Sequence, residues 1–289
     1  MTNLVQKQEM NKYIVLVASV CLLIIGMILH VAVGSSAVSF TEVIKAIFAP
    51  DDSKQTTIVQ TLRLPRAVLA ALIGASLAVA GALMQAITRN SLASPQVFGV
   101  NAGASLAIVI AFILFPDLTS QSTVYIAFLG AALGGITVYL FASGGKITHV
   151  KILLPWSFLG LLLAFGSSRS ISILVLGENM ATGLGEKVKW IRFFAGILVI
   201  MLAGASVAVA GPIGFVGLIV PHIARKLVGG DYQRILPFSA ILGAILLVYA
   251  DVLSRFIAYP FESPVGIVTA LIGAPFFLYL ARKGRNIKQ

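Results

Sequence analysis

The sequence predicts an all-α, polytopic membrane protein, a multi-helix bundle that forms a single transmembrane domain over residues 1–289. Its mean hydropathy is +1.00 and 58% of its 289 residues are hydrophobic, whereas 11% are charged, compared with about 25% in soluble domains. Because so few polar side chains cannot cover a soluble globule, the apolar excess is expected to face lipid. The net charge of +11 comes mainly from Lys and Arg between apolar runs, where the positive-inside rule explains it better than nucleic-acid binding does.

The first apolar run covers residues 14–33, directly after Lys7 and Lys12. About 20 residues at ~1.5 Å each are enough to cross a hydrocarbon core of ~30 Å. No small-residue cleavage motif follows the run, which favours a retained span over a secretory signal. The single cysteine, Cys21, lies within this run, so no disulfide framework is expected.

Eight further apolar runs follow along the chain, which gives about nine visible spans. They cover residues 67–87, 97–115, 124–142, 152–166, 193–210, 212–224, 236–254 and 264–281. The stretch 193–224 is too long for one straight span, since about 32 residues would measure ~48 Å. A turn at Gly211-Pro212 is expected to divide it.

Small residues recur at helix-packing spacing inside these runs. Gly74, Ala78 and Gly81 share one face of the run 67–87, and Gly243 lies in a later run. Such residues allow helix backbones to approach closely. Most spans carry no charge near their centre, which argues against a proton relay.

The charge pattern suggests that one crossing is missing. Both ends of the chain are basic and are therefore expected in the cytoplasm, which requires an even number of crossings. Starting from a cytoplasmic N-terminus, the run 152–166 would deliver Arg169, Lys187 and Arg192 to the outer side, where basic residues are disfavoured. A helix absent between about residues 146 and 151 would repair both the parity and the charge bias.

The segment between residues 211 and 221 predicts an irregular or broken helix. Its glycines and prolines are Gly211, Pro212, Gly214, Gly217 and Pro221. Irregular backbone at membrane depth is tolerated only where protein or a cavity satisfies its polar groups. A lining role beside a transmembrane pathway and simple packing between helices both fit this pattern.

Motifs for chemistry on the chain itself are absent from the sequence. Gly144-Gly145-Lys146-Ile147 lacks the Ser or Thr that must follow the lysine of a phosphate-binding loop. His222 has no second metal ligand three or four residues away. We therefore expect no enzyme activity, no resident cofactor and no metal site in this chain.

Several phrases carry a specific resemblance. They are Leu62-Arg63-Leu64-Pro65-Arg66, Gly81-Ala82-Leu83-Met84-Gln85, Asn90-Ser91-Leu92-Ala93-Ser94-Pro95, the stretch from Gly211 to His222, and Pro264-Val265-Gly266-Ile267-Val268-Thr269. Together they resemble the FecCD-type permease subunits of the iron-siderophore, haem and vitamin B12 ABC importers, the type II importers. The resemblance covers nearly the whole chain.

This resemblance implies a subunit of about ten helices in the cytoplasmic membrane of a prokaryote. It implies a permease pair, identical or related, two cytoplasmic ATP-binding cassette subunits that use ATP and magnesium, and an extracytoplasmic substrate-binding protein. Family members carry a fifth helix between pieces that resemble Ser143–Thr148 and His149–Trp156, which are fused here.

The cargo that the resemblance favours is a ferric siderophore. The spans offer neither the oxygen nor the thiolate ligands that bare iron needs, so a chelated complex suits them better. Haem and vitamin B12 are the alternatives within the same importer type. A secondary transporter driven by an ion gradient is a further alternative, although it would require intramembrane ionisable groups or inverted repeats.

Three arginines stand on the expected outer side, where positive charge is disfavoured. Arg63 and Arg66 are three residues apart and are expected to point roughly the same way from a helical turn. Arg255 lies at the outer end of a later span, four residues after Asp251, so an intrahelical ion pair is available. The resemblance implies that these arginines dock against acidic residues of the binding protein; the alternative is a role as snorkelling anchors.

The stretch 176–185 is too polar and too rich in glycine to cross a bilayer. It predicts two short helical pieces separated by a glycine, on the cytoplasmic side. The resemblance implies that this elbow inserts into a groove of the ATPase and couples nucleotide-site closure to transport. The residues assigned to coupling are Gly177, Glu178, Ala181, Gly183, Leu184 and Gly185.

Overall fold

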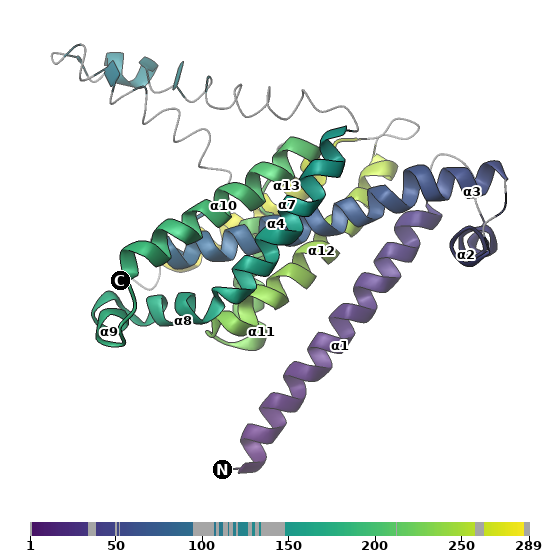
Figure 1. Ribbon diagram of the computed structural model, residues 1–289. Coiled ribbons are helices and arrows are strands. Elements are labelled where there is room, and N and C mark those ends of the chain that lie inside the picture. The colour runs from purple at the N-terminus through teal and green to yellow at the C-terminus, as the bar shows by residue number, and fades with distance from the viewer. Residues whose placement is uncertain are drawn as a thin grey trace.

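The computed structural model describes residues 2–33, 39–49, 51, 53–94, 148–211, 213–257 and 263–285, together with scattered positions between 107 and 133. Every described regular element is helical (Figure 1), as the sequence predicted. The elements are α1 (Thr2–Ala32), α2 (Phe40–Phe48), α3 (Lys54–Ile58), the π-helical turn η1 (Val59–Arg63), α4 (Leu64–Thr88), α7 (Thr148–Gly166), α8 (Ser168–Leu176), α9 (Glu178–Gly183), α10 (Val188–Ala210), α11 (Val216–Val228), α12 (Tyr232–Ile257) and α13 (Val265–Arg285).

Within this described part of the chain, four helical stretches are long and apolar enough to cross a membrane. They are Tyr13–Ala32, Lys54–Thr88, Val188–Val207 and Tyr232–Ile257; Pro155–Gly166 with Ser168–Leu176, bent by 51°, would make a fifth. The predicted runs at 97–115 and 124–142 fall mostly outside the described residues, as do residues 141–147 beside the suspected gap. The count of nine spans therefore stays a prediction.

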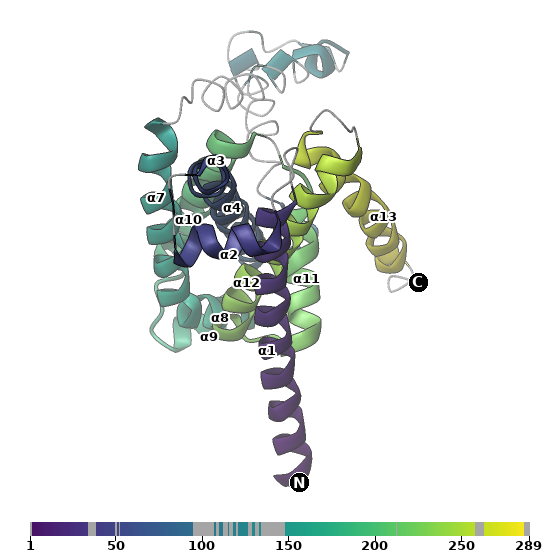
Figure 2. The same cartoon turned by 90° about the vertical axis from the view of Figure 1, so that its right-hand side faces the viewer.

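Helix α4 is the centre of the bundle. Every residue from Ile73 to Leu83 is buried, the pattern of a helix enclosed by others on all sides. Helices α10, α11 and α12 pack around it, and the two perpendicular views show it inside the bundle (Figures 1 and 2). Large side chains that are completely buried, such as Leu83, Leu202 and Leu236, join α4, α10 and α12 in one hydrophobic core.

The predicted small residues bring helices together. A Cβ atom placed on Gly74 would lie 2.1 Å from the carbonyl oxygen of Gly243 in α12, and one on Gly81 would lie 2.0 Å from that of Gly217 in α11. No side chain fits at such distances, so these glycines let the backbones touch. The predicted close approach is confirmed.

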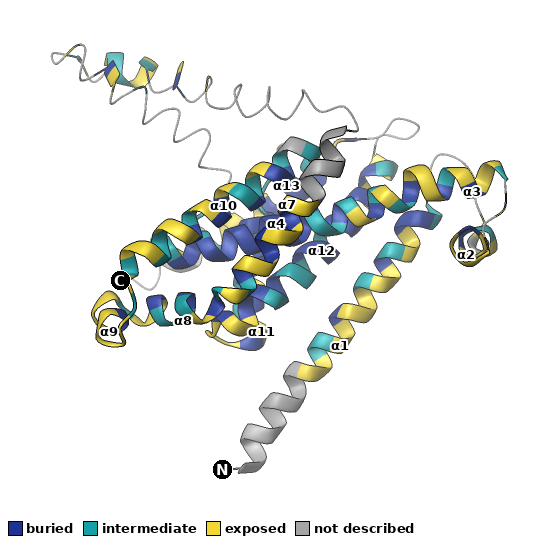
Figure 3. Ribbon diagram, viewed as in Figure 1, coloured by how far each residue is buried: buried dark blue, intermediate teal, exposed yellow. Residues whose placement is uncertain are grey.

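The outside of the bundle is apolar. On α1 and α10, only 22% and 33% of the most apolar stretches are buried, and Figure 3 shows exposed residues along both helices. Ile24 and Ile25 of α1 and Ile200 of α10 are more than half exposed. A surface of this kind matches lipid rather than water.

The predicted turn between α10 and α11 is present, but its boundary differs. Helix α10 ends at Ala210, and Gly211 has a φ of +73°; Pro212 is outside the described residues. The run predicted at 212–224 is shifted, because Phe215 also has a positive φ, +68°, and α11 begins only at Val216. The helix then continues to Val228 rather than ending at 224.

Candidate functional site

The predicted arginines and the predicted elbow lie at opposite ends of α4. Arg63 directly precedes its first residue, Arg66 lies in its first turn, and Arg89 follows its last residue. Arg89 Nη2 donates to the carbonyl oxygen of Leu174 in α8, at 3.2 Å, three residues before the elbow begins at Gly177. Since 25 residues at ~1.5 Å each measure ~37 Å, α4 separates the two sites by about the thickness of a bilayer.

Asp251 of α12 is the centre of the arginine cluster. Arg66 donates to both of its carboxylate oxygens, from Nε at 3.0 Å and from Nη2 at 2.9 Å. Arg255 Nη2 donates to Oδ2 at 3.0 Å, which confirms the predicted intrahelical pair. His30 of α1, fully buried, places Nε2 2.7 Å from the same Oδ2. One carboxylate thus joins α1, α4 and α12.

Arg63 and Arg255 also satisfy the end of α1. Arg63 Nη1 donates to the carbonyl oxygens of Val31 and Ala32, both at 2.9 Å. Arg255 Nη1 donates to those of His30, at 3.0 Å, and Val33. The last carbonyls of a helix have no intrahelical partner and attract positive charge, so two arginines from other helices cap α1.

This capping corrects one expectation. Arg63 and Arg66 do not point the same way: Arg63 turns to α1 because the open carbonyls there attract it, whereas Arg66 turns to Asp251. Exposure separates them as well. Arg63 is 7% exposed and the side chain of Arg255 is 8% exposed, whereas that of Arg66 is 40% exposed. The sequence offered no signal for His30, because a lone histidine in an apolar run has no pattern around it.

A cavity of about 390 Å³ opens beside this pair. Arg66 and Asp251 form its charged wall, and α10 and the stretch before α13 supply apolar walls. Ala210 and Ile213, on either side of the break at Gly211, line it too. The break therefore lies next to a cavity, whereas Gly214, Gly217 and Pro221 are not among its lining residues.

Gly217 and Pro221 instead serve the contact between α4 and α11. Because Pro221 has no N–H, the carbonyl of Gly217, four residues earlier, lacks its helical partner. Gln85 Nε2 of α4 donates to that oxygen at 3.3 Å, and Arg225 donates to Gln85 Oε1. Both Gln85 and Gly217 are buried. Sequence reasoning missed this interaction, because the partner of Gln85 in α11 lies 132 residues away in the chain.

The elbow forms one complete short helix. Gly177, with φ +134°, ends α8 and starts α9, and Gly185, with φ +82°, ends the turn after it. The stretch 176–185 therefore holds one helical piece, α9, rather than the two predicted, and the helix on the other side of Gly177 is α8, which ends at Leu176. Ala181 is buried, whereas Leu184 is 64% exposed and Glu178, also exposed, forms an ion pair with Arg192 of α10.

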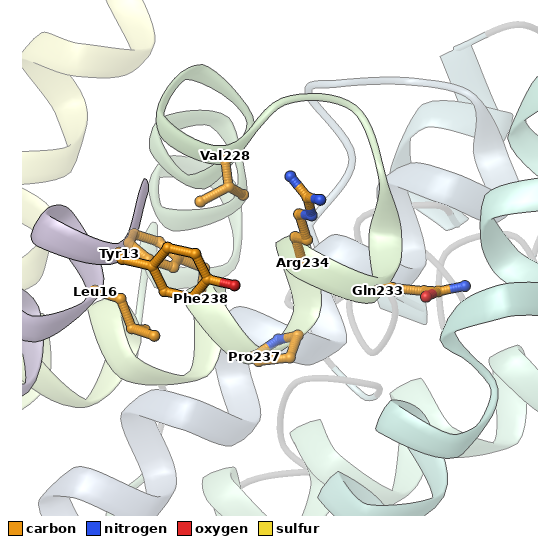
Figure 4. A pocket seen from close by; sticks show the side chains of 7 residues that line it. All are labelled: Tyr13, Leu16, Val228, Gln233, Arg234, Pro237 and Phe238. Carbon is orange, nitrogen blue, oxygen red and sulfur yellow. The ribbon is translucent and has the colours of Figure 1, made fainter. Parts of the chain in front are cut away.

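Two more cavities lie at the end of the bundle opposite to the arginine cluster. One of about 460 Å³ lies between α8 and the start of α10, where Ser170 Oγ donates to Glu186 Oε1 at 3.1 Å. The other, of about 240 Å³, lies where Tyr13 and Leu16 of α1 face α11 and α12 (Figure 4). Among the described residues, no group of three His, Cys, Asp or Glu side chains could hold a metal ion.

Comparison with known proteins places this geometry in a family. The model of the FecCD transport family matches residues 22–155 and 141–283. The Fe(3+)-citrate import system permease protein YfmD of Bacillus subtilis (strain 168) is 47% identical over 329 residues, which cover 98% of this chain and 98% of that protein. The iron(3+)-hydroxamate import system permease protein FhuB of the same organism is 40% identical, covering 94% of this chain and 84% of that one.

A solved structure agrees with the sequence relatives. It is described as the inward-facing conformation of a transporter assigned to the metal-chelate type of ABC transporters. It superposes with a TM-score of 0.71 and 26% identity, over 93% of this chain and 99% of that chain. Together with the apolar helices, these matches make the protein a multi-pass membrane protein, and the chain belongs to the FecCD transport family.

Proposed function

We propose that this chain is the permease subunit of an ATP-driven importer that carries a ferric siderophore across the cytoplasmic membrane of a prokaryote. The observation that carries the proposal is the 47% identity to an Fe(3+)-citrate import permease over 98% of both chains. The names of the relatives specify Fe(3+)-citrate and iron(3+)-hydroxamate. Both are oxygen-rich iron complexes, so the shared cargo class is a ferric chelate. Ferric citrate is the first cargo to test.

The energy would come from partner subunits. We assign ATP hydrolysis and magnesium to two ATP-binding cassette subunits that contact the elbow. The exposed Met180 and Leu184, on and beside the short helix α9, support helix-in-groove recognition, in which an amphipathic helix lays apolar side chains in a groove. The Glu178–Arg192 pair ties α9 to α10, so a push on α9 would reach a membrane-crossing helix.

At the outer end, Arg66 is the principal candidate for contact with a substrate-binding protein. Its guanidinium is the most exposed of the three arginines, and Arg255 shares its partner Asp251. A guanidinium pairs with carboxylates in a bidentate geometry, and such charge pairs fix the register of two surfaces. The 390 Å³ cavity beside Arg66 would receive cargo from the docked protein, with Ala210 and Ile213 along its wall.

We also propose that the chain lacks one membrane crossing between about residues 146 and 151. The alignment with YfmD has 329 positions whereas this chain has 289 residues, so at least 40 positions have no counterpart here. The family model matches in two pieces that meet at residues 141–155. About 20 residues are needed for one crossing. Intact-protein mass spectrometry tests this: a mass of 30.4 kDa supports it, and a clearly larger mass contradicts it.

Uptake of radioactive iron tests the cargo. A strain that lacks this permease would be supplied with labelled ferric citrate, a ferric hydroxamate, haem or labelled vitamin B12, before and after complementation. We expect complementation to restore uptake of a ferric chelate only, and vanadate, which inhibits ATPases of this type, to abolish it. Restored haem or vitamin B12 uptake would overturn the cargo, and uptake that persists without ATP would overturn the importer.

A further inference from the structure

Helix α2 has an apolar surface that the rest of the described protein leaves open. Val43 and Ala46 are 3% and 0% exposed and pack with Val31 of α1 and Val59 of η1. Ile44, Ile47 and Phe48 are 46%, 43% and 82% exposed. This helix of nine residues therefore buries two apolar side chains and presents three others outward.

The order of the side chains around the helix is informative. At ~100° per residue, the apolar positions span an arc of about 200°. The packed pair, Val43 and Ala46, occupies one edge of that arc, and Ile47, Ile44 and Phe48 occupy the rest. Lys45 follows on the polar side, whereas Thr41, seven residues before Phe48, lies close to Phe48 at the boundary. One side of the helix thus faces protein, the next is apolar and uncovered, and the third suits water, which is the arrangement of a helix that lies in a membrane interface.

The orientation of α2 fits this arrangement. In Figure 1 the helix is seen end-on while α4 runs across the view, and in Figure 2 it is seen lengthwise while α4 points toward the viewer. Helix α2 therefore lies roughly perpendicular to α4. Because α4 crosses the bilayer, α2 lies along the membrane surface, at the outer ends of α1 and α4.

Local interactions hold the helix in this position. Ser39 and Glu42 form a reciprocal capping box at its start, and Gln60 Nε2 of η1 donates to the carbonyl oxygen of Ala46 at 2.8 Å. Lys45 lies 3.8 Å from Asp51. Since the charges of α2 have partners nearby, the outward surface offers apolar contact rather than charge complementarity to another protein.

We propose that Ile44, Ile47 and Phe48 insert into the outer leaflet of the bilayer and that α2 is an interfacial anchor. Continuity supports lipid as the occupant: Ile28 and Leu29, near the end of α1, are 39% and 42% exposed on a membrane-crossing helix, and α2 joins that end through Val43 and Val31. The same end of α1 is capped by Arg63 and Arg255. The anchor therefore sets the height of the arginine cluster relative to the membrane surface.

Site-directed spin labelling tests the anchor without knowledge of the cargo. Cys21 is the single cysteine, so Cys21→Ser provides a background for Ile44→Cys, Ile47→Cys and Phe48→Cys. Lys45→Cys on the same helix is the matched control. The full-length chain, with any subunits that co-purify, would be reconstituted in nanodiscs of phosphatidylethanolamine and phosphatidylglycerol, and collisions with oxygen and with a water-soluble nickel chelate would be measured.

We expect the ratio of oxygen to nickel collisions at 44, 47 and 48 to exceed that at 45 by at least about threefold, since oxygen concentrates in lipid and the chelate does not. Equal, nickel-accessible signals at all four positions would overturn the proposal. Protection of positions 44, 47 and 48 from both reagents would also overturn it, because a protein would then cover them. Dipolar broadening of the spectra between two copies of the chain would overturn it for the same reason. The three positions report separately, so one misfolded variant leaves two readouts.

Discussion

Arg66 donates to both carboxylate oxygens of Asp251, at 3.0 and 2.9 Å, and so joins the first turn of α4 to the last turns of α12. Asp251 also receives Arg255 and lies against His30. It is thus a single negative charge among three basic side chains. The carboxylate is therefore more important for the fold than either of the arginines that it binds. Substitutions of Asp251 and of its basic partners are expected to have different effects.

Replacement of Asp251 by Asn is expected to lower stability by about 3–5 kcal/mol, because it leaves the buried Arg255 without its counter-charge. Thermal unfolding of the detergent-purified protein would measure this loss. Glu178→Gln is the matched control, since it removes an acid from an exposed ion pair, which contributes only about 0–1 kcal/mol. An unchanged melting temperature in the Asp251 variant would show that the network does not support the fold.

Arg63 and Arg66 are expected to respond differently to substitution. Arg63→Gln removes the charged donor to two carbonyls at the end of α1, at a cost of about 1.5–3 kcal/mol. Arg66→Glu is expected to abolish capture of the loaded binding protein, because it reverses the most exposed charge of the cluster. Co-purification at moderate salt and thermal unfolding would separate these effects. Unchanged capture by the Arg66 variant would refute docking there.

Gly81→Ala is expected to destabilise the bundle by about 1–3 kcal/mol, the usual cost of overpacking a core. The added methyl group would lie 2.0 Å from a backbone oxygen of α11, which cannot rotate away. Gly204→Ala in α10 is the control, because no atom lies within 4 Å of its added Cβ. The control should be neutral or slightly stabilising. Equal melting temperatures for the two variants would contradict the close packing.

Gly185→Val is expected to uncouple ATP hydrolysis from import. The backbone of Gly185 has φ +82°, which a β-branched residue adopts only with strain, so the turn after α9 would change shape. Iron uptake and ATPase activity of the reconstituted importer would be measured together. Gly166→Ala, at a position outside the elbow with open space and no positive φ, should keep both. Normal uptake by the Gly185 variant would count against a coupling role.

Acid is expected to loosen the segment that holds α2. Hydrogen bonds from Ser53 and Thr56 lower the pKa of Asp51 from 3.8 to about 2. A lowered carboxyl pKa contributes stability that is complete above the ordinary value and is lost as the pH falls toward the folded value. A spin label at position 48 should therefore gain mobility between about pH 4 and pH 2. In Asp51→Asn that pH dependence should weaken, and an identical titration would exclude Asp51 as its source.

The helical class, the small-residue contacts and the break at Gly211 could be predicted from the sequence. Each depends on local chemistry: apolar runs of sufficient length, glycine spacing and positive φ. The sequence was insufficient for the partners of Arg63, because the open end of α1 lies 31 residues away in the chain. His30 and Gln85 were missed for the same reason, since a polar residue in an apolar helix acquires meaning only when its distant partner is known. The amphipathic α2 was treated only as part of an outer connection.

The two glycine contacts along α4 restrict how this molecule can move. With bare backbones in register at Gly74–Gly243 and at Gly81–Gly217, any axial slip of α11 or α12 would drive side chains into main-chain atoms. Helices α4, α11 and α12 are therefore expected to move as one rigid body. An alternation between outward and inward opening would then require rotation of this rigid body against a neighbouring subunit, or displacement of α10, which is less enclosed. Shear between α4, α11 and α12 would not contribute.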